Sequence, residues 1–86
     1  MPTVTLRYWA SLRAAAGLTE ESVQADTLAV ALAQVRARHA DASRFTTVLS
    51  VCSAVVDGAP VGLRDQAEIV LTEGSVVELL PPFAGG

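Results

Sequence analysis

The sequence contains no lysine, and its only strongly basic residues are six scattered arginines: Arg7, Arg13, Arg36, Arg38, Arg44 and Arg64. The formal net charge is −3. The chain therefore lacks the basic patch that a nucleic-acid footprint requires. We expect no nucleic-acid partner.

Cysteine occurs once, as Cys52, which excludes an internal disulfide, a four-cysteine zinc site and an iron–sulfur cluster built from this chain. Because Cys52 lies within the apolar run Val48–Val56, we interpret it as a small hydrophobic residue of the core. The single histidine, His39, has no histidine or cysteine partner at metal-ligand spacing. We expect no bound metal, and interpret His39 as a cation at a helix end or a solvent-facing residue.

No apolar run approaches the roughly 20 residues that a membrane helix needs, and no basic region followed by an apolar one opens the sequence. We therefore expect a soluble, cytoplasmic protein with no membrane contact. The chain has 86 residues, 51% hydrophobic and 17% charged, as expected for one folded domain with one core. Because so short a chain cannot hold both a substrate cleft and a cofactor domain, we expect no tightly bound cofactor and a partner that supplies most of any active site.

The N-terminal part of the chain shows the alternation of a strand. Apolar and polar residues alternate over Thr3–Tyr8, which predicts a strand with one buried face. Ser11–Ala16 predicts a short helical or irregular turn stopped by Gly17, and Glu21–Gln24 predicts a brief second strand. The two strands should form a hairpin with a wide connection.

After Thr27 the period changes to that of a helix, with apolar residues at i, i+3, i+4 and i+7: Leu28, Ala31, Leu32 and Val35. Asp26 or Thr27 can cap its start. The helix should run from about Leu28 to about His39.

The next segment combines a polar stretch with an apolar run. Asp41–Thr47 is polar, and we expect Phe45 within it to pack under the core. The run Val48–Val56 should contain a strand that ends at Asp57 and Gly58, since Asp-Gly is a strong hairpin signal.

The last third of the chain completes the sheet. Ala59–Val61 should return from the hairpin as a short strand, Gln66–Leu71 should be extended, and Glu73-Gly74 should turn the chain into a final strand, Val76–Leu80. Four of the five residues in that strand are apolar, which favours a central strand buried on both faces.

This order of elements predicts an α+β fold of the β-grasp, ubiquitin-like type. A helix between two hairpins packs on one face of a mixed sheet of about five strands, with the first and last strands as parallel neighbours at its centre. We expect residues 1–80 to form this domain and residues 81–86 to form an extended tail.

The tail consists of two prolines, a phenylalanine, an alanine and two glycines: Pro81, Pro82, Phe83, Ala84, Gly85 and Gly86. Prolines stiffen an extended path, and the glycines leave no side chain next to the terminal carboxylate. With a pKa near 3.5, a free carboxylate resists nucleophilic attack until it is activated, for example as an acyl-adenylate. A thin terminus suits an enzyme that must close around it.

Three segments carry a resemblance to a known family. Leu80–Gly86 resembles the Pro-Pro-x-x-Gly-Gly ending of the small subunit of molybdopterin synthase, in the ubiquitin-like MoaD/ThiS family of sulfur carriers. Trp9–Arg13 followed by Gly17 is similar to the family's segment after its first strand, and Ala54–Gly58 resembles its hairpin. The resemblance covers nearly the whole chain.

The resemblance implies a sulfur carrier that is not an enzyme on its own. An E1-like adenylyltransferase would use ATP to adenylate the terminal glycine, and sulfur would then be installed there as a thiocarboxylate. The loaded protein would dock into a large catalytic subunit, as part of a heterotetramer, and donate sulfur to cyclic pyranopterin monophosphate, an intermediate of molybdenum cofactor biosynthesis.

The resemblance also implies roles for residues of this chain. Gly86 would accept the adenylate and the sulfur, and Gly85 would pass through the enzyme's channel. The docking stretch would consist of Pro81, Pro82, Phe83 and Ala84. Arg13 is either a surface ion-pair residue or a contact to the partner.

Three alternatives remain open from the sequence. Carriers for thiamine thiazole or cysteine synthesis share the fold and the Gly-Gly ending. A ubiquitin-like modifier joined to target lysines would use the same ending, although a chain without lysine offers no side-chain amine on which to build further copies. A plain β-grasp interaction module would keep its function without Gly86.

Overall fold

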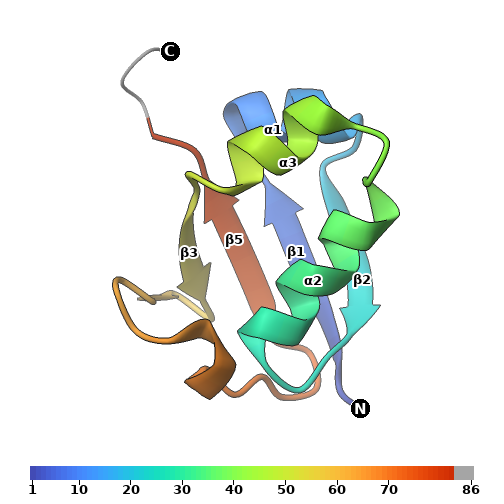
Figure 1. The fold of residues 1–86 in the computed structure, drawn as a ribbon. Coiled ribbons are helices and arrows are strands. Elements are labelled where there is room, and N and C mark those ends of the chain that lie inside the picture. The colour runs from blue at the N-terminus through green and yellow to red at the C-terminus, as the bar shows by residue number, and fades with distance from the viewer. Residues whose placement is uncertain (83–86) are drawn as a thin grey trace.

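The computed structural model describes residues 1–82, which form a five-stranded mixed sheet with three α-helices (Figure 1). In chain order the elements are β1 (Thr3–Tyr8), α1 (Ala10–Ala16), β2 (Glu20–Gln24), α2 (Leu28–Arg38), α3 (Ser43–Leu49), β3 (Ser53–Val56), β4 (Ala59–Pro60), the 3-10 helix η1 (Gln66–Glu68) and β5 (Val76–Leu80).

The strand order is β2-β1-β5-β3-β4, so the first and last strands lie at the centre of the sheet. β1 runs parallel to β5 and antiparallel to β2, and β3 runs antiparallel to both β5 and β4. This is the β-grasp topology, and it confirms the predicted fold class and the predicted parallel pair.

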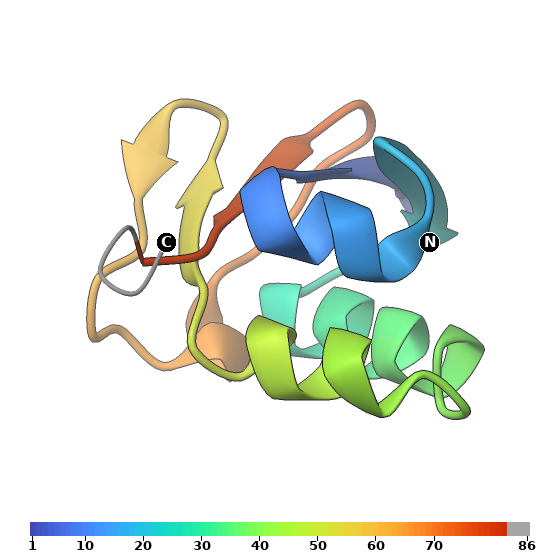
Figure 2. The same cartoon turned by 90° about the horizontal axis from the view of Figure 1, so that it is seen from above.

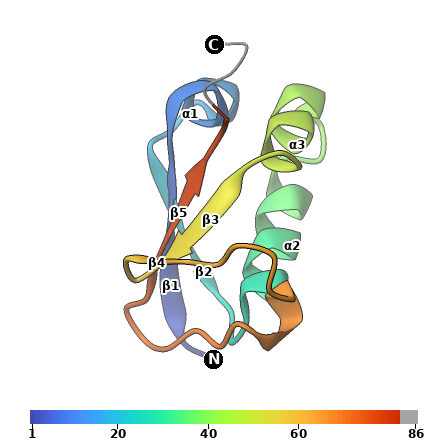
Figure 3. The ribbon, with the colours of Figure 1, turned by 90° about the vertical axis from the view of Figure 1, so that its left-hand side faces the viewer.

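The helices cover one face of the sheet and leave the other uncovered (Figure 3). α2 and α3 lie on that one side, and α1 packs against α3 at the end of the sheet (Figure 2). Alternate residues of β1, among them Leu6 and Tyr8, point into the core between the layers, together with Phe45 of α3 and Val35 of α2. The core therefore has a single layer of contact, between the helices and one sheet face.

Several boundaries agree with the sequence. α2 begins at Leu28 because the side chain of Thr27 accepts a hydrogen bond from the Val30 amide, and it ends one residue before His39. Gly17, with φ of 77°, adopts the left-handed conformation that ends α1. Asp57 and Gly58 form the predicted hairpin turn, and both have positive φ.

Two predictions for the middle of the chain are wrong. The helix α3 occupies Ser43–Leu49, where we expected no helix, and the strand predicted within the run Val48–Val56 is β3, Ser53–Val56. Gln66–Glu68 forms a 3-10 turn and not an extended segment, because Oδ1 of Asp65 accepts a hydrogen bond from the Ala67 amide and caps it.

β5 is central, but it is fully buried on one face only. Val77 and Leu79 point into the core, whereas Val76, Glu78 and Leu80 are half-buried. The prediction of burial on both faces is wrong because no helix among the described residues covers the second face of the sheet. We call that second face the open face.

Candidate functional site

The predicted tail begins at the end of the central strand. Leu79 pairs with Tyr8 of β1, and Leu80 pairs with Ser53 of β3, so β5 is held on both sides up to its last residues. Pro81 and Pro82 have no amide hydrogen with which to continue the ladder, and the chain leaves the sheet there (Figure 1). The tail therefore follows a strand that is paired on both sides.

Two of the six predicted tail residues lie within the described structure. Pro81 is half-buried and Pro82 is exposed. The other four lie outside the described residues: Phe83, Ala84, Gly85 and Gly86.

The structure brings Arg13 to the same end of the sheet. Because β1 and β5 are parallel, their C-terminal ends meet at one edge, and α1 follows β1 directly through Trp9. Arg13 lies on α1 and is exposed, and it makes no ion pair with any of residues 1–82. Arg13 is thus available to a partner that approaches the root of the tail.

The open face beside the tail carries a half-buried apolar strip. On β5, the half-buried Val76 and Leu80 point to this face. Val55 of β3, also half-buried, stands opposite Glu78 of β5, and the exposed Pro60 of β4 stands opposite Val55. Glu78 lies between Val76 and Leu80 on β5. An apolar strip next to the point where the chain leaves the sheet is a suitable surface for a partner that also binds the tail.

Cys52 lies in the loop between α3 and β3, next to Ser53, and is half-buried. Its Sγ donates a hydrogen bond to the carbonyl oxygen of Val48 at 3.3 Å, and burial raises the pKa of the Cys52 thiol to about 11. A thiol that stays protonated at neutral pH is a poor nucleophile. These surroundings favour a packing role for Cys52. The residue is half-buried, whereas the sequence predicted a fully buried core residue.

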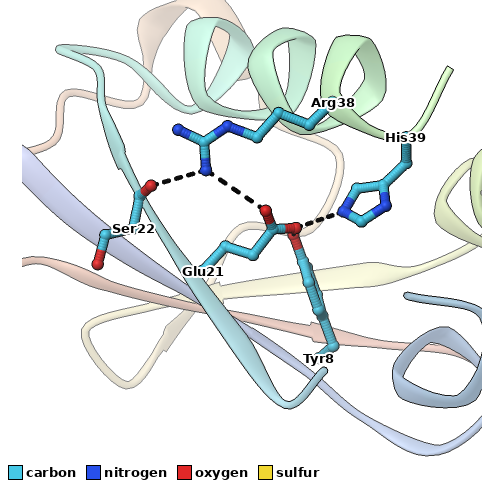
Figure 4. A network of polar contacts seen from close by, with 5 residues as sticks. All are labelled: Tyr8, Glu21, Ser22, Arg38 and His39. Atoms are coloured by element: carbon cyan, nitrogen blue, oxygen red, sulfur yellow. Dashed lines mark hydrogen bonds and ion pairs between the residues drawn. The ribbon is translucent and has the colours of Figure 1, made fainter. Parts of the chain in front are cut away.

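A cluster of four polar side chains ties β1, β2 and the end of α2 together (Figure 4). We call Tyr8, Glu21, Arg38 and His39 the polar cluster. Oε2 of Glu21 accepts a hydrogen bond from the Tyr8 hydroxyl at 2.5 Å and lies 2.5 Å from Nε2 of His39. Oε1 of Glu21 pairs with Arg38 at 3.3 Å, and the Arg38 guanidinium also donates to the carbonyl oxygen of Ser22 at 2.8 Å.

The electrostatics of the polar cluster favour an ionised Glu21. Burial alone would raise the pKa of Glu21, but hydrogen bonds from Tyr8, His39 and Arg38 outweigh it and hold the pKa below its ordinary value of 4.5. Burial and the bond to Glu21 raise the pKa of Tyr8, which therefore remains a donor. Every member has a hydrogen-bond or ion-pair partner within the cluster, so the cluster stabilises the fold and offers no free group for chemistry.

The sequence did not reveal the polar cluster. His39 is not solvent-facing: its side chain is 14% exposed, and its ring stacks on Phe45 with 4.1 Å between ring centroids. Its partner Glu21 is 18 residues away in the chain, so no local period connects them. The one signal available was a charged residue at a core-facing strand position, since Glu21 pairs with Leu6.

Two general features of residues 1–82 bear on the choice of function. In this part of the chain, histidine, cysteine, aspartate and glutamate side chains form no group of three that is placed to hold a metal ion. No helix of the described residues has the length and apolar character needed to cross a membrane.

Comparisons with known proteins extend this description. A family model described as the ThiS family matches residues 6–86, whereas no curated protein matches the sequence. The small archaeal modifier protein 1 from Methanosarcina acetivorans has a similar structure, with a TM-score of 0.83 and 19% identity over 100% of this chain and 98% of that chain.

Two further solved structures bear the name of molybdopterin-converting factor. A candidate subunit 1 from Pyrococcus furiosus has a TM-score of 0.76 and 20% identity, covering 95% of this chain and 99% of that chain. A chain of the complex of subunits 1 and 2 from Helicobacter pylori has a TM-score of 0.64 and 23% identity, and the match covers 98% of this chain and 99% of that chain. At these identities the likeness shows the fold.

Proposed function

Because this chain belongs to the ThiS family, we propose that it is a sulfur carrier, the small subunit of a molybdopterin synthase, with the carboxylate of Gly86 as its working group. The observation that carries the proposal is the position of the tail. The central strand β5 is paired with β1 as far as Leu79 and with β3 as far as Leu80, and the sequence then continues through two prolines to Gly85-Gly86.

The proposed chemistry begins with activation of the carboxylate. A carboxylate oxygen of Gly86 attacks the α-phosphorus of ATP on an E1-like adenylyltransferase, and pyrophosphate leaves. Hydrosulfide then displaces AMP and leaves a thiocarboxylate. The thiocarboxylate sulfur finally bonds to a carbon of cyclic pyranopterin monophosphate, and water cleaves the acyl–sulfur bond, which leaves the sulfur on the pterin and returns the carrier to the carboxylate. Gly85 has no side chain to obstruct the channel through which Gly86 passes.

The active site for each of these steps belongs to a partner. The polar cluster is internally satisfied, and burial keeps Cys52 protonated, so neither supplies a nucleophile. The complex of subunits 1 and 2 of molybdopterin-converting factor from Helicobacter pylori contains a structurally similar chain, which supports a large subunit as partner. We propose a heterotetramer of two carriers and two large subunits.

Docking in this proposal uses the tail and the open face together. Pro81 and Pro82 limit the conformational freedom that the tail loses when it enters the large subunit. Phe83 and Ala84 would follow them into the partner, with Phe83 filling an apolar pocket. The half-buried Val55 and Leu80 would be covered at the same time.

The test is reconstitution of sulfur transfer with purified proteins. Thiocarboxylated carrier and the large subunit of the same organism are mixed with cyclic pyranopterin monophosphate, and formation of molybdopterin is measured. Conversion that depends on the thiocarboxylate supports the proposal. If the wild-type carrier neither binds the large subunit nor converts the precursor, the molybdenum pathway is wrong, and thiazole or cysteine synthesis takes its place.

A modifier of other proteins is the second candidate, favoured by the likeness to the small archaeal modifier protein 1. The same acyl-adenylate could be attacked by a lysine amine of a target, which would form an amide and release AMP. Because this chain has no lysine, its own side chains could not extend such a conjugate. Covalent adducts that survive denaturation and disappear when Gly86 is deleted would favour this candidate.

A further inference from the structure

A small surface pocket lies where β1, α1 and β2 meet. Its volume is about 200 Å³, and it is lined by Arg7, Tyr8, Trp9, Arg13, Thr19 and Glu20. We call it the arginine pocket. Two of the six arginines of an acidic chain therefore face one small cavity, beside a Trp9 that is 40% exposed.

The charges of the arginine pocket are incompletely balanced. Nε of Arg7 lies 3.6 Å from Oε1 of Glu20, and both side chains are about half exposed. So long and exposed a pair is readily exchanged for another partner. Arg13 has no ion-pair partner among residues 1–82. The pocket thus retains positive charge and free guanidinium donors that suit a carboxylate.

The arginine pocket stands at the end of the sheet from which the tail leaves. In the register of the parallel strands β1 and β5, Tyr8, which lines the pocket, stands opposite Leu79, and Arg7 stands opposite Glu78. Leu80, the last residue of β5, follows directly. A protein that encloses the tail from this end therefore comes into contact with the pocket as well.

We propose that the arginine pocket receives an acidic surface segment, carrying aspartate or glutamate, of the protein that takes the tail. The inference rests on the proposed function for the identity of that protein, the adenylating partner. Carboxylates of the segment bind the guanidinium groups of Arg13 and Arg7 and displace Glu20, while its aliphatic atoms cover Trp9. The contact orients the carrier before Gly86 enters the active site, so Arg13 is a positioning residue.

The pocket contains its own reporter, because Trp9 is the single tryptophan of the chain. Its fluorescence is followed while terminally blocked tetraglutamate is added, with tetraglutamine as the uncharged control. We expect a saturable change with tetraglutamate only. Arg13→Glu should weaken it about tenfold, and about 0.5 M salt should weaken it severalfold.

Arg36→Glu is the matched control, because Arg36 is exposed on α2 outside the pocket and the change in charge is the same. It should leave the titration within about twofold of wild type. Equal weakening by the two variants would mean that only net charge matters and would overturn the proposal. Tighter binding of inorganic phosphate than of tetraglutamate would also overturn it, since the pocket would then be a small-anion site.

A second measurement separates this inference from the proposed function. In adenylation by the E1-like partner, Arg13→Glu should raise KM for the carrier about tenfold and leave kcat nearly unchanged, as expected for a docking contact. An unchanged KM overturns the docking proposal even if tetraglutamate binds. If the wild type is not adenylated at all, the proposed function fails, and the fluorescence titration still decides whether the pocket binds acidic segments.

Discussion

The polar cluster and the tail are built on opposite principles. In the cluster, Glu21 is surrounded by Tyr8, Arg38 and His39, and side-chain contacts hold three elements together. The tail, beyond the last paired residue of β5, ends in two residues without side chains, Gly85 and Gly86. The domain is stabilised where side chains are dense, and the proposed chemistry takes place where they are absent. Stability and sulfur transfer should therefore be separable by mutation.

The largest expected effect is on the tail alone. Deletion of Gly86 or the substitution Gly85→Leu should reduce thiocarboxylate formation by about 100-fold or more. The deletion displaces the reacting carboxylate, and the leucine side chain obstructs its path into the active site. The melting temperature should not change, since both positions lie beyond β5. Intact-mass spectra and thermal melts measure the two properties, and Ala33→Leu on the exposed side of α2 is the control for added bulk. A deletion variant that still gains sulfur at its terminus would contradict the comparison.

The next effect is the converse, on stability alone. Glu21→Gln should cost about 2 kcal/mol of unfolding free energy at pH 7, because it removes a charged acceptor from three donors. The pKa of Glu21 is lowered in the folded state, so its contribution is complete above 4.5 and is lost as the pH falls through the folded value.

Urea denaturation at pH 7 and at about pH 3 tests this prediction. The difference between wild type and Glu21→Gln should shrink at the lower pH. Glu20→Gln is the neighbouring control, and it should change stability by about 0.5 kcal/mol or less, because the Glu20 pair with Arg7 is exposed. A pH-independent difference for Glu21→Gln would show that packing, and not charge, accounts for the loss. Sulfur loading should be unchanged wherever the variant is folded.

A smaller effect is expected for docking of the tail. Phe83→Ala should weaken binding to the large subunit by about tenfold, equivalent to about 1.4 kcal/mol, because an apolar side chain loses its partner pocket. Adenylation should suffer less, since that step depends on the two glycines. Titration calorimetry measures the binding, with Leu63→Ala as the control, because Leu63 is fully exposed on the domain itself. Equal losses for both variants would refute a specific role of Phe83.

The smallest effect is expected for Cys52→Ala. The side chain is half-buried and donates one weak hydrogen bond to Val48, so we expect a loss of about 1 kcal/mol or less and unchanged sulfur transfer. Denaturation and single-turnover transfer of sulfur from thiocarboxylated protein measure the two properties. A variant that loads normally and fails to pass sulfur onward would place Cys52 in the relay.

The parts of the fold that were predicted correctly have local signals. Alternation identified β1, the helical period and a capping residue at Asp26 or Thr27 identified α2, and Asp57-Gly58 identified the hairpin. The candidate tail could also be predicted from local signals, since Pro81-Pro82 and Gly85-Gly86 act through their own backbone properties. Its residues 83–86 lie outside the described structure, and their roles stay predictions.

The parts that were missed depend on contacts distant in sequence. α3 contains Thr46, Thr47 and Val48, which have low helix propensity, and it forms because Phe45 and Leu49 are buried against the core. The spacing of those two apolar residues, four apart, was the signal that could have revealed it.

The polar cluster and the arginine pocket were missed for the same reason. Glu21 meets His39 only after α2 has packed beside β2. Arg7 and Arg13 share a pocket only because α1 folds back over the end of β1. Composition suggested scattered arginines, and the fold brings two of them together.

The most direct test of the central claim is the mass of the wild-type protein after incubation with its E1-like adenylyltransferase, ATP and a sulfur source. The account predicts that one oxygen is replaced by sulfur, that fragmentation places the change at Gly86, and that omission of ATP abolishes it. An unchanged mass, or sulfur found on Cys52 with Gly86 unmodified, would contradict the claim that this chain carries sulfur at its terminal carboxylate.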